Sequence, residues 1–252
     1  MALGIPLLVL AWSFSWSAAA AGEGERVLGP DYLPLKAHLQ IRTRYELNRT
    51  TAGELYKQGL PDGGAKMDLS GLEPKYVQKV PCAETELEVG RGQFHEVYTG
   101  TAKKVGSQHA LCCVNRTRPW ASASYRGLKP LQTVYECNYV KKGRVHRSHI
   151  RPGEMGGGGS TRATALNDQL WLGRRWACAS RTMCEVTALL PRLQIGPVSF
   201  ADVVVVESSS SSMIHRRWYA RGVGPVMLLS FSEKHTFANL TVYSHAPLPA
   251  KP

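Results

Sequence analysis

The stretch PVSFADVVVVESSSSSMIHRRWYARGVGPV, from Pro197 to Val226, decides the fold. Its four consecutive valines, Val203 to Val206, favour a buried strand, because branching at Cβ restricts a side chain in a helix and packs well on a pleated sheet. The serines Ser208 to Ser212 that follow bury too little apolar area to offset the entropy of ordering. They therefore predict a solvated connection to the next strand.

The second half of this stretch reads as another strand and a turn. From Ile214 to Arg221, apolar and polar side chains alternate with the period of two that is typical of a half-buried strand. Gly222 to Pro225 predict a turn or bulge, since glycine adopts unusual backbone angles and proline cannot donate a ladder hydrogen bond. Two more alternating segments, Val226 to Phe231 and Thr236 to Tyr243, complete an antiparallel meander.

These residues resemble a pattern found in bacterial exported proteins of unknown function. In that group a Gly-x-x-x-Phe-x-Asp segment leads into an apolar strand, as Gly196 to Asp202 do here, and a Tyr-Ala-x-Gly-Val-Gly turn follows, as in Tyr219 to Gly224. The segment Asp31 to Lys36 is similar to the Tyr-(Phe/Leu)-Pro-Leu opening of the same group. The shared motifs are turns and strand edges and carry no chemistry, so the resemblance implies an exported β-rich protein and no activity.

Further alternating segments extend the meander toward the amino terminus. His38 to Leu47 predicts a strand whose Gln40, Arg42, Arg44 and Glu46 face outward. Glu84 to Val89 and Phe94 to Val105 predict a hairpin across a glycine-containing loop. We therefore expect a mainly β chain with few helices, folded as an antiparallel meander into a curved or partly closed, half-barrel-like sheet.

The first residues predict export. An apolar segment, Leu3 to Trp16, precedes the small residues Ala18 to Ala21, which is typical of a secretory signal peptide over residues 1–21. No Lys or Arg precedes the apolar segment, so the alternatives are an uncleaved anchor, a truncated start or a mis-annotated start codon. Residues 22–252 are expected to form one β-rich domain with a flexible loop at 153–161, in a periplasmic or extracellular location.

Six cysteines in an exported chain predict disulfides. Six cysteines allow 15 connectivities, and the sequence does not choose among them. Cys112 and Cys113 point to opposite faces of a strand, so they should serve different partners or one of them is a buried thiol. Cys178 and Cys184 can bridge only if a turn intervenes, because a disulfide needs Cα atoms within about 7 Å.

The motifs of the common enzyme classes are missing from the sequence. It has no Gly-x-Ser-x-Gly elbow and no phosphate-binding glycine loop. Zinc ligands from His146 and His149 with Cys137, or from Cys178 with Cys184, lack standard spacing. We therefore expect no enzyme, no metal and no cofactor. A hydrolase would need a histidine bonded to a serine or cysteine, and the histidines to inspect are His95, His146 and His215.

The charge of the chain favours anionic partners. Thirty-one Lys and Arg against 19 Asp and Glu give a net charge of +12. The best candidate for a binding surface is a basic hairpin at residues 141–151, the alternative being a solvated hairpin tip. It would bind anionic lipid or polysaccharide rather than nucleic acid, because it lacks stacking aromatics. The candidate residues are Lys141, Lys142, Arg144, Arg147 and Arg151.

Two functions fit these patterns. The first is a non-catalytic exported module that binds a ligand in the cell envelope or serves a structural role there. The alternative is a carrier that holds a lipid or other apolar ligand in a half-barrel. A carrier needs an unfilled cavity of several hundred Å³, whereas a structural module should have a packed interior.

Overall fold

The structure is a computed structural model that describes residues 26–58, 65–89, 94–96, 107–117, 132–150, 162–179, 182–210, 213–232 and 238–247. The predicted signal peptide at residues 1–21 and the predicted loop at 153–161 lie outside these ranges. No helix within them is long and apolar enough to cross a membrane.

Strands dominate the described chain, and the elements follow one another in this order: β1 (Val27–Leu28), a 3₁₀ turn η1 (Gly29–Tyr32), β2 (His38–Leu47), α1 (Arg49–Gln58), β3 (Ala65–Met67), β4 (Tyr76–Val89), β5 (Phe94–Glu96), β6 (Ser107–Thr117), β7 (Gln132–Lys141), β8 (Arg144–Ile150), β9 (Arg162–Leu166), β10 (Gln169–Leu170), β11 (Arg175–Ala179), β12 (Thr182–Ile195), β13 (Val198–Ser209), β14 (Met213–Ala220), β15 (Gly224–Ser232) and β16 (Ala238–Ala246).

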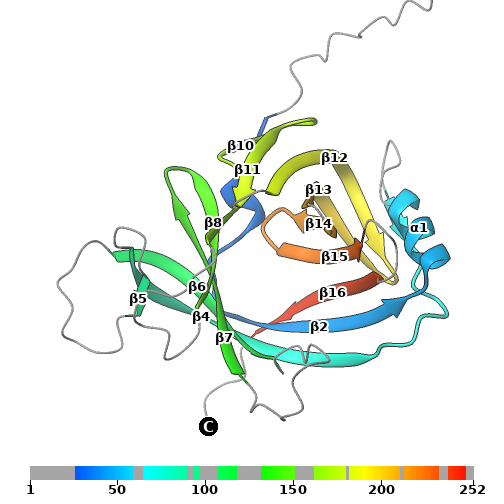
Figure 1. Ribbon diagram of the computed structural model, residues 1–252, viewed down its shortest axis with the longest axis horizontal. Helices are drawn as coiled ribbons and strands as arrows, with labels where there is room; N and C mark the ends of the chain where they lie inside the picture. Colours follow the sequence, from blue (N-terminus) through cyan, green and yellow to red (C-terminus); the bar gives the residue numbers. More distant parts are fainter. Residues whose placement is uncertain are drawn as a thin grey trace, which may run out of the picture.

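Fourteen strands form one sheet, in the spatial order β11-β12-β13-β14-β15-β16-β2-β4-β6-β7-β8-β9, with β3 beside β12 and β5 beside β4. Strands β1 and β10 form a separate pair. All neighbours are antiparallel except β3 and β12. The sheet curves strongly (Figure 1), from β12 and β13 through β16 and β2 to β6, β7 and β8. The prediction of a mainly β chain with few helices and a curved, partly closed sheet is confirmed.

Among the described residues, no backbone ladder closes the sheet. Its path ends at β9 on one side and at β11 on the other. The two end strands nevertheless meet through a side chain, since Trp176 Nε1 on β11 donates a hydrogen bond to the Thr164 carbonyl on β9 at 3.0 Å. We call this junction of β9 and β11 the seam. Trp176 is buried.

The outer face of the sheet carries the larger core. Val203, Val205, Trp218 and Leu229 point to this side and are fully buried or nearly so. Helix α1 covers part of it, packing Ala52 and Leu55 against the same cluster, and β3 and the far end of β12 complete the cover. The helix begins after Asn48, whose Oδ1 accepts a hydrogen bond from Thr51 N at 2.9 Å, as a helix N-cap does.

The opposite, inner face carries a second core at one end. There η1 places Tyr32 and Leu33 against Val204, Val206 and Tyr219. An ion pair links η1 to the turn after β14, since Arg221 Nη2 lies 3.0 Å from Asp31 Oδ2. Gly222 and Gly224 hold the predicted turn with φ angles of 68° and 102°. The predicted turn or bulge is therefore confirmed, and the register does shift between Trp218 and Tyr219.

Two predictions about direction are wrong. Gln40 and Arg42 on β2 do not face outward, because Gln40 is 4% exposed and both side chains lie inside the curve of the sheet. Strand β14 is covered on both faces, so His215, Arg217 and Tyr219 point inward instead of to solvent. The serine connection is also shorter than predicted, since Ser208 belongs to β13 and is buried.

Candidate functional site

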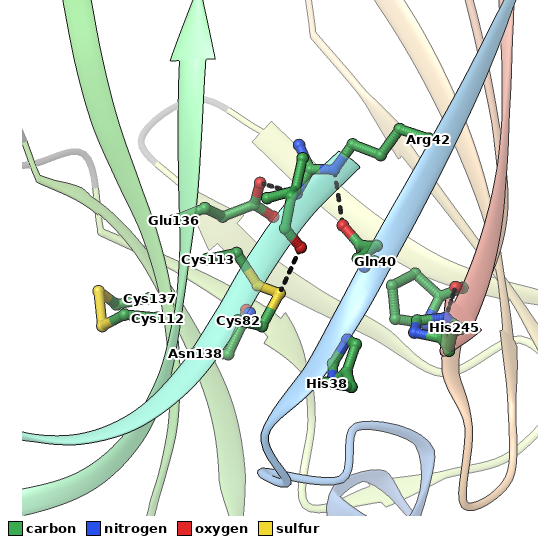
Figure 2. The surroundings of a disulfide bond; sticks show 12 residues. His38, Gln40, Arg42, Cys82, Cys112, Cys113, Glu136, Cys137, Asn138 and His245 are labelled. Atoms are coloured by element: carbon green, nitrogen blue, oxygen red, sulfur yellow. Dashed lines mark hydrogen bonds and ion pairs between the residues drawn. A yellow bond between two sulfur atoms is a disulfide. The ribbon is translucent and has the colours of Figure 1, made fainter. Parts of the chain in front are cut away.

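Three disulfides fix the strands around the inner face. Cys82 on β4 pairs with Cys113 on β6, and Cys112 on β6 pairs with Cys137 on β7. These cysteines are direct cross-strand neighbours with Cα separations of 4.0 and 4.1 Å. Figure 2 shows the two bridges on opposite sides of the sheet. Cys112 and Cys113 thus serve different partners, as predicted.

The third disulfide joins Cys178 on β11 to Cys184 on β12, and these two strands pair antiparallel, so the chain reverses between the two cysteines as the bridge requires. All six cysteines are therefore in disulfides, and none is left to hold zinc. Within the described residues, no three His, Cys, Asp or Glu side chains cluster as metal ligands would.

The inner face encloses a cavity of about 430 Å³, which we call the inner cavity. Its wall includes residues from β2, β4, β7, β8, β9 and β11 to β16, so the curved sheet wraps around it. Apart from its tyrosines, this wall has six ionisable side chains. They are one histidine, one glutamate and four arginines: His215, Glu136, Arg42, Arg44, Arg147 and Arg217.

Glu136 compensates two of these arginines. Its Oε2 lies 3.1 Å from Arg42 Nη2 and its Oε1 lies 3.1 Å from Arg147 Nε. Figure 2 shows Arg42 directed at both Glu136 and Gln40, and its Nε donates to Gln40 Oε1 at 2.6 Å. Burial acts to lower the pKa of Arg147, but the Glu136 carboxylate and then the tyrosines Tyr219 and Tyr243 raise it above its usual value.

Arg44 is held by neutral groups. Its Nε donates to Asn239 Oδ1 at 3.2 Å, and its Nη1 donates to the Tyr76 hydroxyl at 3.1 Å. The guanidinium also lies over the Tyr76 ring, 5.7 Å from the centroid. Such contacts fix the direction of the side chain.

Arg217 has the least compensated charge of the four. Its Nη1 donates a long hydrogen bond of 3.4 Å to Ser208 Oγ. Among the described residues, no carboxylate lies within ion-pair distance of it. Strand pairing places it between two apolar neighbours, with Val206 on one side and Leu228 on the other. A guanidinium in this position retains donors for a carboxylate, sulfate or phosphate group.

Sheet register arranges these groups as a row. Successive cross-strand neighbours on β13, β14, β15, β16, β2 and β4 all line the inner cavity, and their order is Val206, Arg217, Leu228, Thr241, Arg44 and Tyr76. The two arginines in this row are three strands apart, roughly 14 Å along the sheet. Both therefore project into the same cavity from well-separated points of its wall.

The pKa of His215 is affected by the nearby Arg217. Burial, followed by the positive charge of Arg217, lowers the pKa of His215 to about 4. At neutral pH its ring is therefore uncharged, and its Nδ1 lies 2.8 Å from Ser230 Oγ across the strand pair. Four arginines and one glutamate consequently leave the described wall of the inner cavity with an excess of three positive charges.

The contact between His215 and Ser230 is the histidine–serine pair that a hydrolase would need. Within the described residues, no carboxylate is placed to orient the His215 ring, which a triad requires. Of the other two histidines, His146 stacks on Tyr139 with its Nδ1 3.4 Å from Thr164 Oγ1. The side chain of His95 lies outside the described residues.

The described residues of the predicted basic surface do not all lie on one side of the sheet. Lys142 and Arg144 are exposed at the β7–β8 turn, with Arg144 Nε 3.9 Å from Asp168 Oδ1, and Lys141 is half-buried beside them. Arg147 does not lie on this exposed surface, since it points into the inner cavity and pairs with Glu136. Arg151 lies outside the described residues.

Comparison with known proteins adds little to this geometry. No protein-family model matches the chain, and no characterised protein matches it in sequence. Among solved structures, the chain is similar to a crystal structure from Parabacteroides distasonis described as a putative lipoprotein. The match covers 84% of this chain and 96% of that one, but at 8% identity and a TM-score of 0.34 it carries no argument about fold or function.

Proposed function

We propose that this protein is an exported, non-catalytic binding module that holds an anionic ligand in the inner cavity. The observation that supports this proposal is Arg217, a partly buried guanidinium without a carboxylate partner among the described residues, in a wall with three excess positive charges. Burying charge is costly unless it is paired. An anionic group bound beside Arg217 would supply the missing partner.

Two further observations support the proposal. Three disulfides suit a protein that folds in an oxidising compartment, which agrees with the expected export. The volume of about 430 Å³ lies in the range of small-molecule sites. The charged wall favours an anionic ligand over a purely apolar one, and the unfilled interior favours a binding module over a structural one.

Native mass spectrometry of the mature chain, purified from its own host, tests the proposal. We expect a bound acidic species on the wild type and its loss from Arg217→Gln, because hydrogen bonds to charged groups contribute about 1.5–3 kcal/mol each. Arg192→Gln is the matched control, since Arg192 is exposed on β12 and bonds Ser199 outside the cavity.

Thermal unfolding in a panel of acetate, sulfate, phosphate and octyl sulfate provides an independent readout. A ligand at a hundred times its Kd stabilises the folded chain by about 2.7 kcal/mol. An apo wild-type mass, together with no change of Tm in any of these anions, would contradict the proposal and favour a structural module.

A further inference from the structure

The wall of the inner cavity is divided into two chemically different sides. The arginines, Glu136 and the tyrosines come from β2, β4, β7, β8, β14 and β16. The side at the seam is formed instead by small apolar groups and a disulfide, from β9, β11, β12 and β13: Ala163, Ala165, Cys178, Ala179, Cys184 and Val206. We call this side the seam wall. Three hydroxyl residues on the same strands, Thr164, Thr182 and Ser208, interrupt it.

The seam wall has arginine at both of its borders. Val206 on β13 is the cross-strand neighbour of Arg217 on β14, and Ala163 on β9 is the neighbour of Arg147 on β8. Neighbouring strands are about 4.8 Å apart. A ligand that reaches Arg217 with an anionic group therefore lies within van der Waals range of the apolar side chains next to it.

We infer that the ligand is an amphiphilic anion, with its charged group on Arg217 and an apolar portion against the seam wall. This inference rests on the proposed function and names its ligand class. An inorganic anion would leave most of the cavity and all of the seam wall to water, because a water molecule occupies about 30 Å³ and the cavity about 430 Å³. A neutral apolar ligand would leave the charge of Arg217 uncompensated.

Isothermal titration calorimetry with three probes separates the contributions. The probes are octyl sulfate, inorganic sulfate and octyl glucoside, each used below any micelle-forming concentration with the full mature chain. Octyl sulfate has both the anionic group and the alkyl chain. Inorganic sulfate has the anionic group alone, and octyl glucoside has the alkyl chain without a charge. We expect octyl sulfate to bind at least about tenfold more tightly than either of the others, since removing the chain loses apolar burial and removing the charge loses the guanidinium contact.

Variants locate the two contacts. Arg217→Gln should weaken octyl sulfate binding by at least about tenfold, and Arg217→Lys should recover part of it by restoring the charge. Ala163→Asn places an amide in the seam wall and should weaken octyl sulfate several-fold, with inorganic sulfate unchanged. Arg192→Gln should bind all three probes as the wild type does. Near-ultraviolet circular dichroism checks that each variant keeps its packed structure.

The outcomes distinguish the inference from the proposed function. Sulfate binding as tight as octyl sulfate binding, with both lost in Arg217→Gln, would overturn the amphiphile and keep the anion-binding function. Octyl glucoside binding as tight as octyl sulfate binding would overturn both, because the ligand would then be apolar. Failure of all three probes to bind would overturn the inference, and the native mass of the host protein would then decide the proposed function.

Discussion

At the scale of single residues, Glu136 separates two kinds of arginine. Arg42 and Arg147 share its carboxylate at 3.1 Å each, so their charges are balanced within the protein. Arg217 projects into the same cavity, and among the described residues its side chain has only the Ser208 hydroxyl as an acceptor, at 3.4 Å. Glu136 and Arg147 lie on the adjacent strands β7 and β8, whereas Arg217 lies on β14. We therefore assign ligand contact to Arg217 and support of the wall to Arg42 and Arg147.

His215 predicts a pH dependence of stability. Its pKa is lowered to about 4 in the folded chain, from a value of 6.5 when unperturbed. Below pH 6.5 the unfolded state binds the proton first, so stability is full above that pH and is lost as the pH falls toward 4. Burial lowers the pKa of His245 as well, and it acts in the same direction.

We expect His215→Gln to reduce the loss of unfolding free energy between pH 7 and pH 4 by up to about 3 kcal/mol. Urea denaturation at several pH values measures this, with His109→Gln, an exposed histidine on β6, as the control. A wild-type pH profile that His215→Gln leaves unchanged would show that the imidazole is not buried next to Arg217.

At the scale of elements, the disulfides differ in the length of chain they close. The Cys112–Cys137 bridge spans 25 residues and the Cys178–Cys184 bridge spans 6. Loop-closure entropy predicts stabilisation of about 3.5 kcal/mol for the first and about 2 kcal/mol for the second. We expect Cys112→Ala/Cys137→Ala to lose more unfolding free energy in urea than Cys178→Ala/Cys184→Ala. Equal losses would indicate that native-state strain or packing outweighs the unfolded-state constraint.

The elements themselves could largely be predicted from the sequence, but the direction of their polar faces could not. Val203 to Val206 are buried as their branching predicts, and the Gly222 turn is where the pattern placed it. A period of two shows that Arg42 and Arg44 share one face of β2. It does not show whether that face meets solvent or a polar cavity, because curvature of the whole sheet decides this. Helix α1 was not predicted, although Asn48 is a typical N-cap that could have indicated it.

The placement of Arg147 differs from the predicted basic surface for a related reason. A run of basic residues on a hairpin was interpreted as one surface, but alternation along β8 sends Arg147 inward while Arg144 stays exposed. The cavity row from Val206 to Tyr76 draws on six strands and on residues more than 100 positions apart. No local pattern contains that information, since it arises from the register of β13 through β16 with β2 and β4.

At the scale of the whole molecule, the cavity depends on how the two ends of the sheet meet. The described residues of β9 and β11 share no backbone ladder, and the hydrogen bond from Trp176 Nε1 to the Thr164 carbonyl links the two strands. Closure by a side chain is weaker than closure by a ladder, because one neutral hydrogen bond contributes about 0.5–1.5 kcal/mol. The seam should therefore open more readily than any pair of strands joined by a ladder.

Trp176→Phe tests this idea, since it removes the indole donor and keeps an aromatic ring in the buried position. We expect a Tm lower by about 2–4 °C, from a loss of about 1 kcal/mol in a chain of this size. Hydrogen exchange should accelerate at the amides of β9 and β11 and stay unchanged at those of β14 and β15. Trp171→Phe is the control, because Trp171 lies outside the seam beneath Arg174, whose Cζ is 4.3 Å from the ring centroid. Uniformly faster exchange across all strands would mean that the seam does not open as a separate unit, and that the sheet loosens only as a whole.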